Sequence, residues 1–310
     1  MATVERIPLG PLEAVVLGAE DLRATFVPGA GMIGSSLLHR GEELLVQRGG
    51  LGAWRGTGKS FGLPLLHPWA NRLRDWRYCV AGRAVTIDRA RGIVRGDENE
   101  LPIHGALAAA EDWDVLDVGA DGDAAWLHAA LDYGRRDDRL AVFPFPHRLE
   151  LELRLEGDAL SLTTTVVATG DGPVPLAFGW HPWLGLPGVA RAEWELVQPA
   201  RTEIALDARN LPTGARAAAG AERGPLGDRA LDAHSLVEAD ARFAVAGGGR
   251  EIAVEWAGGY RYAQVFAPAV LDVVCLEPMM APIDALTIGE EVLCAQPGER
   301  AGATFRVCVT

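Results

Sequence analysis

The sequence predicts an all-β fold, a large β-sandwich made of many short strands. First, leucines alternate with charged residues over residues 148–156, and a period of two places the leucines on one face of a strand. Second, short apolar or alternating runs recur along the whole chain, with Gly, Pro and Asp between them. Third, helical spacing is never sustained, and strands do not alternate with helices as they do in a doubly wound sheet.

The clearest element is a hairpin over residues 147–170. Its first half carries four leucines at alternate positions from 149 to 155, between arginines and glutamates that favour the solvent side. "EGD" then supplies a turn, and "ALSLTTTVV" returns with β-branched residues. We therefore expect a hairpin with one buried face.

Further short runs are predicted as strands on the same grounds. They are residues 13–18, 22–28, 84–89, 113–119, 124–133, 192–198, 251–258, 261–268, 272–278 and 303–310. The Ala/Gly/Arg-rich stretch 213–231 is expected to be a long surface loop. Because the strand pattern is the same on both sides of this stretch, we expect a single domain over residues 1–310.

Composition and charge exclude several classes of partner. The formal net charge of −13 argues against nucleic acid or an anionic membrane surface as the main partner. No window approaches the roughly 18 uninterrupted apolar residues of a membrane helix, and the N-terminus has no export-signal pattern. The four cysteines form no C-x-x-C pair, so neither a disulfide framework nor a zinc site is expected. These features favour a cytoplasmic location, as a monomer or homodimer.

Four polar positions stand in stiff apolar surroundings, where loops on a rigid scaffold often carry function. Asn71 and Arg72 follow a Pro-Trp stretch, and the arginine offers a planar fork of donors for an oxygen-rich ligand. His104 precedes Gly105, whose missing side chain allows close approach of a ligand or another backbone. Each of these residues could instead be an ordinary core or surface residue, and His67 is equally compatible with the core and with the rim of a site.

The other two positions combine an ionisable group with apolar neighbours. His181 lies in "PLAFGWHPWLGLPG", where Trp and Phe faces suit the binding of a sugar ring. Glu277 ends the apolar run "VVCL" and precedes a proline, and a carboxylate there is costly unless it is paired or used. A histidine held in the core and a strand-end glutamate turned to solvent are the alternatives.

The chain has no metal-ligand spacing, no G-x-S-x-G elbow, no phosphate-binding glycine loop and no dinucleotide fingerprint. The expected site is therefore a set of Arg, His, His and Glu, without a nucleophile, metal or cofactor.

The order of these motifs resembles the aldose 1-epimerase (galactose mutarotase) family. "GLPLLHPWANR", "PIHG" followed by "WDV", "FGWHPWL" and "LEPMMAPIDAL" occur in that order, and the similarity extends from about residue 25 to the C-terminus. The resemblance implies a β-sandwich of the galactose-mutarotase type (a supersandwich). It also implies an isomerase that interconverts the α and β anomers of an aldose.

The resemblance further implies residue roles. Glu277 matches the general base of the family and His181 matches its general acid. The expected substrate-binding residues are Asn71, Arg72, His104 and Asp232, the last being the best match to an aspartate that holds sugar hydroxyls. His67, Ala70 and the "ALAAA" after Gly105 depart from the family pattern, which bears on the choice of sugar more than on the reaction.

Anomer interconversion needs only proton movement, since the anomeric hydroxyl loses a proton while the ring oxygen gains one. We expect a base and an acid on opposite sides of the ring. The reaction needs an ionised Glu and a protonated His at the same time. With ordinary pKa values of about 4.3 for Glu and about 6.5 for His, both conditions hold only between those two pH values. A site working near neutral pH is therefore expected to raise the pKa of His181 through nearby negative charge.

Three alternatives stay open from the sequence. A hexose-6-phosphate mutarotase would need a second basic cluster, for which Arg74 and Arg77 are available. A non-catalytic sugar-binding protein on the same scaffold would not need both Glu277 and His181. A polysaccharide lyase or hydrolase is disfavoured because no second carboxylate motif pairs with Glu277.

Overall fold

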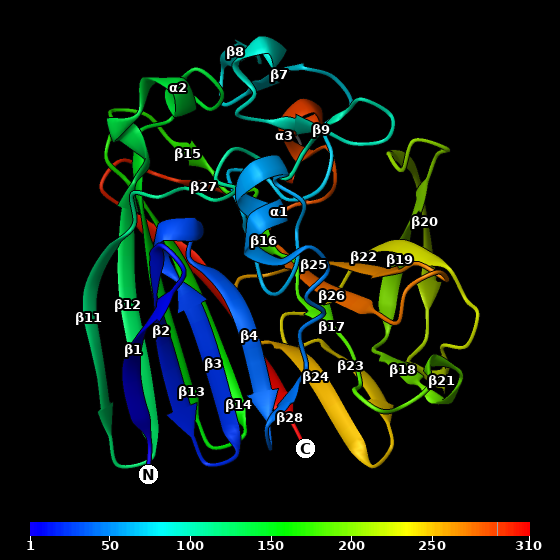
Figure 1. The fold of residues 1–310 in the computed structure, drawn as a ribbon. Coiled ribbons are helices and arrows are strands. Elements are labelled where there is room, and N and C mark those ends of the chain that lie inside the picture. The colour runs from blue at the N-terminus through cyan, green and yellow to red at the C-terminus, as the bar shows by residue number, and fades with distance from the viewer. Residues whose placement is uncertain (290) are drawn as a thin grey trace.

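The fold is dominated by antiparallel sheets. A computed structural model describes residues 1–289 and 291–310 (Figure 1). A five-stranded sheet contains, in spatial order, β1 (Thr3–Leu9), β2 (Leu12–Ala19), β3 (Leu22–Val27), β4 (Ile33–His39) and β5 (Glu42–Glu43). A nine-stranded sheet has the order β11 (Asp114–Asp121), β12 (Ala124–Asp132), β13 (His147–Glu156), β14 (Ala159–Ala168), β28 (Arg300–Val309), β24 (Arg250–Trp256), β23 (Arg242–Gly247), β18 (Glu195–Gln198) and β21 (Glu222–Pro225).

An eight-stranded sheet carries the segments that form the site. It contains β20 (Pro212–Ala219), β19 (Arg201–Leu206), β22 (Leu231–Leu236), β25 (Tyr262–Ala267), β26 (Val274–Met279), β16 (Gly179–Trp180) and β6 (Leu65–Leu66), with β17 (Trp183–Leu184) also paired to β26. Short two-stranded pairs are β7 (Arg77–Val80) with β8 (Arg83–Thr86), β9 (Arg95–Gly96) with β10 (Pro102–Ile103), and β15 (Val174–Pro175) with β27 (Cys294–Ala295).

Helices are short. They are α1 (Gly50–Thr57), α2 (Asp137–Leu140) and α3 (Ala285–Ile288), with 3-10 turns at η1 (Pro28–Ala30), η2 (Arg89–Arg91), η3 (Tyr133–Arg135) and η4 (Arg191–Glu193). Within the described residues, none of these helices has the length and apolar character needed to cross a membrane.

The sheets pack face to face, as the sequence predicts for a sandwich. The five-stranded sheet lies against one end of the nine-stranded sheet, where β2 contacts β12 and β13 and β1 contacts β11 (Figure 1). Towards its other end the nine-stranded sheet meets the eight-stranded sheet, through a contact between β23 and β26. The predicted all-β sandwich is therefore confirmed.

The hairpin predicted over 147–170 is formed by β13 and β14, the second of which ends at Ala168. The leucines at 149, 151, 153 and 155 are each at most 1% exposed, while the charged residues between them are half-buried or exposed. The strands pair in antiparallel register from His147 with Ala168 to Glu156 with Ala159. Burial of one leucine face against the five-stranded sheet is the physical reason that the register does not slip, because a shift of one residue would expose all four side chains.

The expectation of a surface loop over 213–231 is wrong. This stretch contains β20 and β21, which pair with β19 and β18 and form the outer edges of two sheets. Their side chains are mostly exposed, so the residues show no alternation of apolar and polar types. Backbone hydrogen bonds to the neighbouring strands hold them in place. A search for hydrophobic periodicity cannot detect such strands.

His67 and His147 form a pair of buried histidines. Nδ1 of His147 is 2.6 Å from the carbonyl oxygen of Phe145, so this nitrogen carries the proton, since a carbonyl can only accept. Nε2 of His147 is then the acceptor for Nε2–H of His67, at 2.8 Å. Burial lowers the pKa of His147 to about 4 and that of His67 well below its ordinary value. Both rings are therefore neutral in the folded protein, and His67 is a core residue.

We predict that acid destabilises the fold before carboxylates titrate fully. The unfolded chain binds protons on these histidines near pH 6.5, whereas folded His147 does so only near pH 4. The free energy of unfolding should fall by about 1 kcal/mol per pH unit for each such histidine as the pH drops through this window. Urea unfolding between pH 7 and 4.5 measures the slope. His67→Phe should reduce the slope; a flat profile would contradict the assignment.

Candidate active site

The six predicted site residues border one cavity of about 420 Å³. They are Asn71, Arg72, His104, His181, Asp232 and Glu277. Trp183 and Phe266, whose ring centroids are 6.0 Å apart, form an aromatic wall on the same cavity. The pocket therefore joins loops and strands from distant parts of the chain, with ionisable groups and an apolar surface facing the same space.

Glu277 stands on β26, a strand with sheet neighbours on both sides. It is 1% exposed and pairs in register with Gln264 of β25. Every residue of β26 is buried, so the strand cannot turn Glu277 to solvent. Its Oε2 has no hydrogen-bond partner among the described residues, and an uncompensated buried carboxyl is costly, which favours a functional role over a structural one.

His181 is placed opposite Glu277 by strand pairing. β16 and β17 flank it in sequence, and both pair with β26 so that Gly179 faces Met279 and Trp183 faces Cys275. The antiparallel register between those two pairs brings position 181 to position 277. The imidazole stacks on Trp183 with 4.7 Å between ring centroids and an interplanar angle of 4°. His181 Nε2 lies 3.3 Å from Oε1 of Glu277.

This distance overturns the expectation of a base and an acid on opposite sides of a sugar ring. Groups whose reacting atoms are 3.3 Å apart cannot enclose a pyranose. The chemistry does not require them to, because the anomeric hydroxyl and the ring oxygen are bonded to the same carbon. Two adjacent groups on one side of that carbon reach both oxygens.

The expected rise in the pKa of His181 is also wrong. Burial lowers the pKa of this imidazole to about 3, and the positive charges of Arg95, Arg48 and Arg72 act in the same direction. Burial likewise raises the pKa of Glu277 well above its ordinary value, with a contribution from the Asp232 charge. Burial thus opposes charge on both groups and favours a neutral imidazole beside a protonated carboxyl. Burial therefore also opposes the negative charge that Glu277 was expected to supply.

His104 is oriented by the backbone around it. Its Nδ1 accepts a hydrogen bond from the Asn71 backbone N–H at 3.3 Å, so the proton is on Nε2. The next residue, Gly105, packs so closely that a Cβ would lie 2.2 Å from the carbonyl oxygen of His67. The predicted close approach at this glycine therefore occurs with a backbone carbonyl. The His104 ring stands edge-on to His181 at 5.4 Å.

Arg72 is held by a network that the sequence analysis missed. Its Nε donates to Asp97 at 2.5 Å and its Nη2 to Glu98 at 2.9 Å. Asn71 Oδ1 accepts from the Arg72 backbone N–H at 2.9 Å and from Nη1 at 3.2 Å. Both carboxylates lie on an acidic turn after β9 that the sequence analysis did not single out. Only the tertiary fold brings this turn to the arginine.

Asp232 completes this side of the pocket. Its carboxylate accepts a hydrogen bond from Gln264 Nε2, and Oδ2 lies 3.9 Å from Arg72 Nη1. Burial raises its pKa, and the Arg72 charge opposes that rise. Gln264 is a polar residue in the middle of a strand predicted to be apolar. Its pairing with Glu277 places it at the site, and only the structure shows that pairing.

His181, Glu277 and Cys275 are the residues best placed to hold a metal ion. One donor atom from each lies within 4.8 Å of the others, and all three residues are buried. Cysteine spacing could not reveal this group, because its members come from two chain segments. Arg74 pairs with Asp284, and neither Arg74 nor Arg77 lines the pocket, so the phosphate cluster considered from sequence is not at this site.

The sequence from residue 18 to residue 308 matches the family model for aldose 1-epimerase. The chain belongs to the aldose 1-epimerase family. Members of this family are isomerases that act on sugars, and the protein is an enzyme of that class. Comparison with curated proteins found no match.

Solved structures from several organisms share the fold of this protein. A galactose mutarotase-like protein from Clostridium acetobutylicum is 17% identical, with a TM-score of 0.85 over 100% of this chain and 98% of its own. A galactose 1-epimerase from Lactobacillus acidophilus is 14% identical, with a TM-score of 0.78 over 100% and 98%. An aldose epimerase homologue from C. elegans is 15% identical, with a TM-score of 0.70 over 100% and 99%. These likenesses establish the shared fold.

We predict that His181 of the ligand-free epimerase is neutral at pH 7. Burial and the nearby arginines lower its pKa to about 3, so its ring nitrogens should show neutral-imidazole ¹⁵N shifts down to about pH 4. Long-range ¹H–¹⁵N NMR of His181 and the His181→Asn variant, used for assignment, measures this. A titration midpoint between pH 6 and 7 would contradict the role given to burial.

Proposed function

We propose that the protein interconverts the α and β anomers of an aldose by ring opening and re-closure. The reaction requires a base for the anomeric hydroxyl and an acid for the ring oxygen. Glu277 is the proposed base and His181 the proposed acid. The observation that carries this proposal is the 3.3 Å approach of their reacting atoms at the end of a cavity walled by aromatic rings.

The proton count of the pair suits a reversible cycle. With sugar bound, the starting state places the proton on His181 and leaves Glu277 ionised, which is the resting pair with one proton moved across 3.3 Å. Glu277 then takes the hydroxyl proton while His181 gives its proton to the ring oxygen, and the bond between C1 and that oxygen breaks. The pair is now a protonated carboxyl and a neutral imidazole, which is the state that burial favours without ligand.

Re-closure reverses each transfer. Rotation about the bond between C1 and C2 of the open aldehyde presents the other carbonyl face to the chain hydroxyl. His181 takes the proton of that hydroxyl, and Glu277 returns its proton to the carbonyl oxygen. No electron leaves and no group is transferred, so the one transferable proton of the pair and the hydroxyl proton of the sugar suffice.

The remaining polar residues have proposed roles in binding. Arg72 presents donors from a guanidinium that Asp97, Glu98 and Asn71 hold in place. His104 directs Nε2–H away from the backbone that binds Nδ1 and can stabilise the oxygen that gains negative charge. Asp232 would accept hydrogen bonds from sugar hydroxyls. A ring stacked against Trp183 and Phe266 would use the apolar face that pyranoses present.

We predict that Glu277 and His181 are both needed for the rate acceleration. Freshly dissolved α-glucose or α-galactose should reach anomeric equilibrium faster with the protein than in buffer. Glu277→Gln and His181→Asn should each reduce kcat by roughly 10²–10⁴, because each removes one proton-transfer group. Polarimetry or ¹H NMR of the anomeric protons measures the rate.

Exposed Glu203→Gln serves as the matched control and should retain full activity. Survival of activity in both site variants would show that the roles are misassigned. Tight sugar binding without acceleration would instead identify a sugar-binding protein.

We predict that Arg72→Lys weakens substrate binding more than it slows proton transfer. Lysine keeps the charge but cannot reproduce the three directed contacts of the guanidinium. KM should rise about tenfold, the size expected for one charge-assisted hydrogen bond, while kcat changes less. Steady-state kinetics separate the two constants, and a loss confined to kcat would assign Arg72 to the chemical step.

A further inference from the structure

A group of three potential metal ligands lies at the proposed reaction centre. One ligand atom from each of His181, Cys275 and Glu277 lies within 4.8 Å of the other two, and all three residues are buried. Nδ1 of His181 and Oε2 of Glu277 have no hydrogen-bond partner in the part of the chain that the structure describes. Buried polar atoms are normally paired, so two unpaired ligand atoms in one group indicate a site that can bind something further.

Strand pairing places Cys275 on the face of β26 that borders the cavity of about 420 Å³, which we call the main cavity. Cys275 and Glu277 are two residues apart, so their side chains leave the strand on the same side. The sheet neighbours of Cys275 are Trp183 on β17 and Phe266 on β25, and both line the main cavity together with Glu277. An ion that enters this cavity can therefore reach the carboxyl, the imidazole and the thiol.

The types of ligand in this group favour Zn²⁺. Thiolate and imidazole suit zinc, whereas Mg²⁺ and Ca²⁺ prefer oxygen ligands. Cys275 would release its thiol proton to solvent on binding, because the thiolate is the form that coordinates a metal. Three protein ligands would leave the fourth position of a tetrahedral zinc ion to a water molecule or a sugar oxygen.

The positive charges of the main cavity make the thiolate necessary. Arg48, Arg72 and Arg95 line this cavity and oppose the entry of a cation, although Arg72 is paired with carboxylates. Glu277 alone could offer only one negative charge. A thiolate at Cys275 brings the total to two, which balances a divalent cation and leaves the buried group without net charge.

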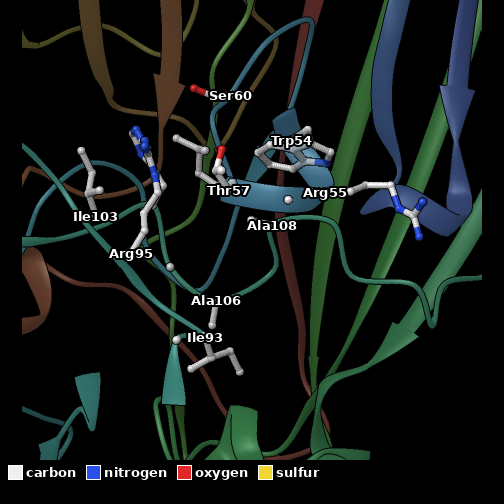
Figure 2. Close-up of a pocket in the computed structure, with 15 residues that line it drawn as sticks. Trp54, Arg55, Thr57, Ser60, Ile93, Arg95, Ile103, Ala106 and Ala108 are labelled. Atoms are coloured by element: carbon white, nitrogen blue, oxygen red, sulfur yellow. The ribbon is translucent and has the colours of Figure 1, made fainter. Parts of the chain in front are cut away.

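The adjoining cavity of about 270 Å³ offers no such group of ligands (Figure 2). His104 is among its lining residues, but they include no Cys, Asp or Glu. Arg95 stands at its border with the main cavity, since it lines both. A cation is therefore expected in the main cavity and not in the adjoining one.

We infer that His181, Cys275 and Glu277 form a binding site for Zn²⁺ and that the bound ion inhibits the enzyme. The inhibitory part of this inference rests on the proposed function. Nε2 of His181 and Oε1 of Glu277 are 3.3 Å apart and are the proposed proton-transfer atoms. Metal coordination occupies the lone pairs that these groups need in order to exchange protons. Cys275 takes no part in the proposed proton transfers, so it distinguishes metal binding from the reaction.

Titration of the full chain with Co²⁺, a spectroscopic analogue of Zn²⁺, tests the site independently of activity. A thiolate in the coordination shell gives a thiolate-to-cobalt charge-transfer band in the ultraviolet. Zn²⁺ added afterwards should remove this band, and Mg²⁺ should not. Cys275→Ala should abolish the band and weaken Co²⁺ binding at least about tenfold, because loss of a second-shell partner alone already costs that much.

Exchange NMR of the anomers of glucose or galactose tests the inhibition. Each protein is compared with its own metal-free rate at buffered concentrations of Zn²⁺. The wild-type protein should lose activity as the ion binds and recover it when EDTA is added. Cys275→Ala should need at least about tenfold more Zn²⁺ for the same fractional loss.

Cys79→Ser is the matched control. Cys79 is an exposed free cysteine on β7, and it does not belong to the group of metal ligands. This variant should retain both the charge-transfer band and the inhibition by Zn²⁺. Loss of the band in Cys79→Ser with retention in Cys275→Ala would assign the thiolate to the wrong cysteine and overturn the site.

Other outcomes separate the inference from the proposed function. Absence of the charge-transfer band in the wild-type protein overturns the metal site and leaves the proposed function intact. Full activity of the zinc-loaded protein overturns the inhibition. If no aldose is accelerated, the proposed function and the inhibition fail together, while the cobalt spectrum still decides the metal site. Thermal unfolding of the metal-free variants shows whether a loss of binding reflects folding.

Discussion

The site depends on one constraint, the burial of a carboxyl beside an imidazole on a strand that cannot turn outward. β26 has sheet neighbours on both sides, so Glu277 stays 1% exposed, and the pairing of β16 and β17 with the same strand brings His181 to 3.3 Å. Burial opposes charge on either group, because it lowers the pKa of His181 and raises that of Glu277. The proposed reaction therefore requires that the bound sugar favour the ionised pair.

The pocket also contains a buried positive charge, which needs stabilising partners. Arg72 is buried yet charged, and such a group is tolerated only when it is paired and hydrogen-bonded. Asp97, Glu98 and Asn71 meet that need and also fix the direction of its donors. Arg95, in the same pocket, makes no hydrogen bond or ion pair with any residue that the structure describes, although the charges of Asp97 and Glu98 raise its pKa.

Much of the fold followed from local patterns. The β13–β14 hairpin was predictable because its leucines alternate and one face is buried. The edge strands β20 and β21 were not, since their side chains are exposed and only backbone pairing holds them. At the site, stiff Pro-Trp and Trp-His-Pro surroundings identified Arg72 and His181 as unusual. Asp97, Glu98 and Gln264 escaped notice because an acidic turn and a lone amide acquire meaning only from what lies opposite them.

The sequence by itself determined the all-β architecture, the family and the residue types available for proton transfer. Periodicity, proline placement and motif order are properties of the sequence, so they can be recognised from it alone. The tertiary structure alone decided the pKa shifts of Glu277 and His181, their side-by-side placement and the carboxylate partners of Arg72. Those properties depend on desolvation and on distances between segments far apart in the chain. Neither quantity can be obtained from the order of the residues.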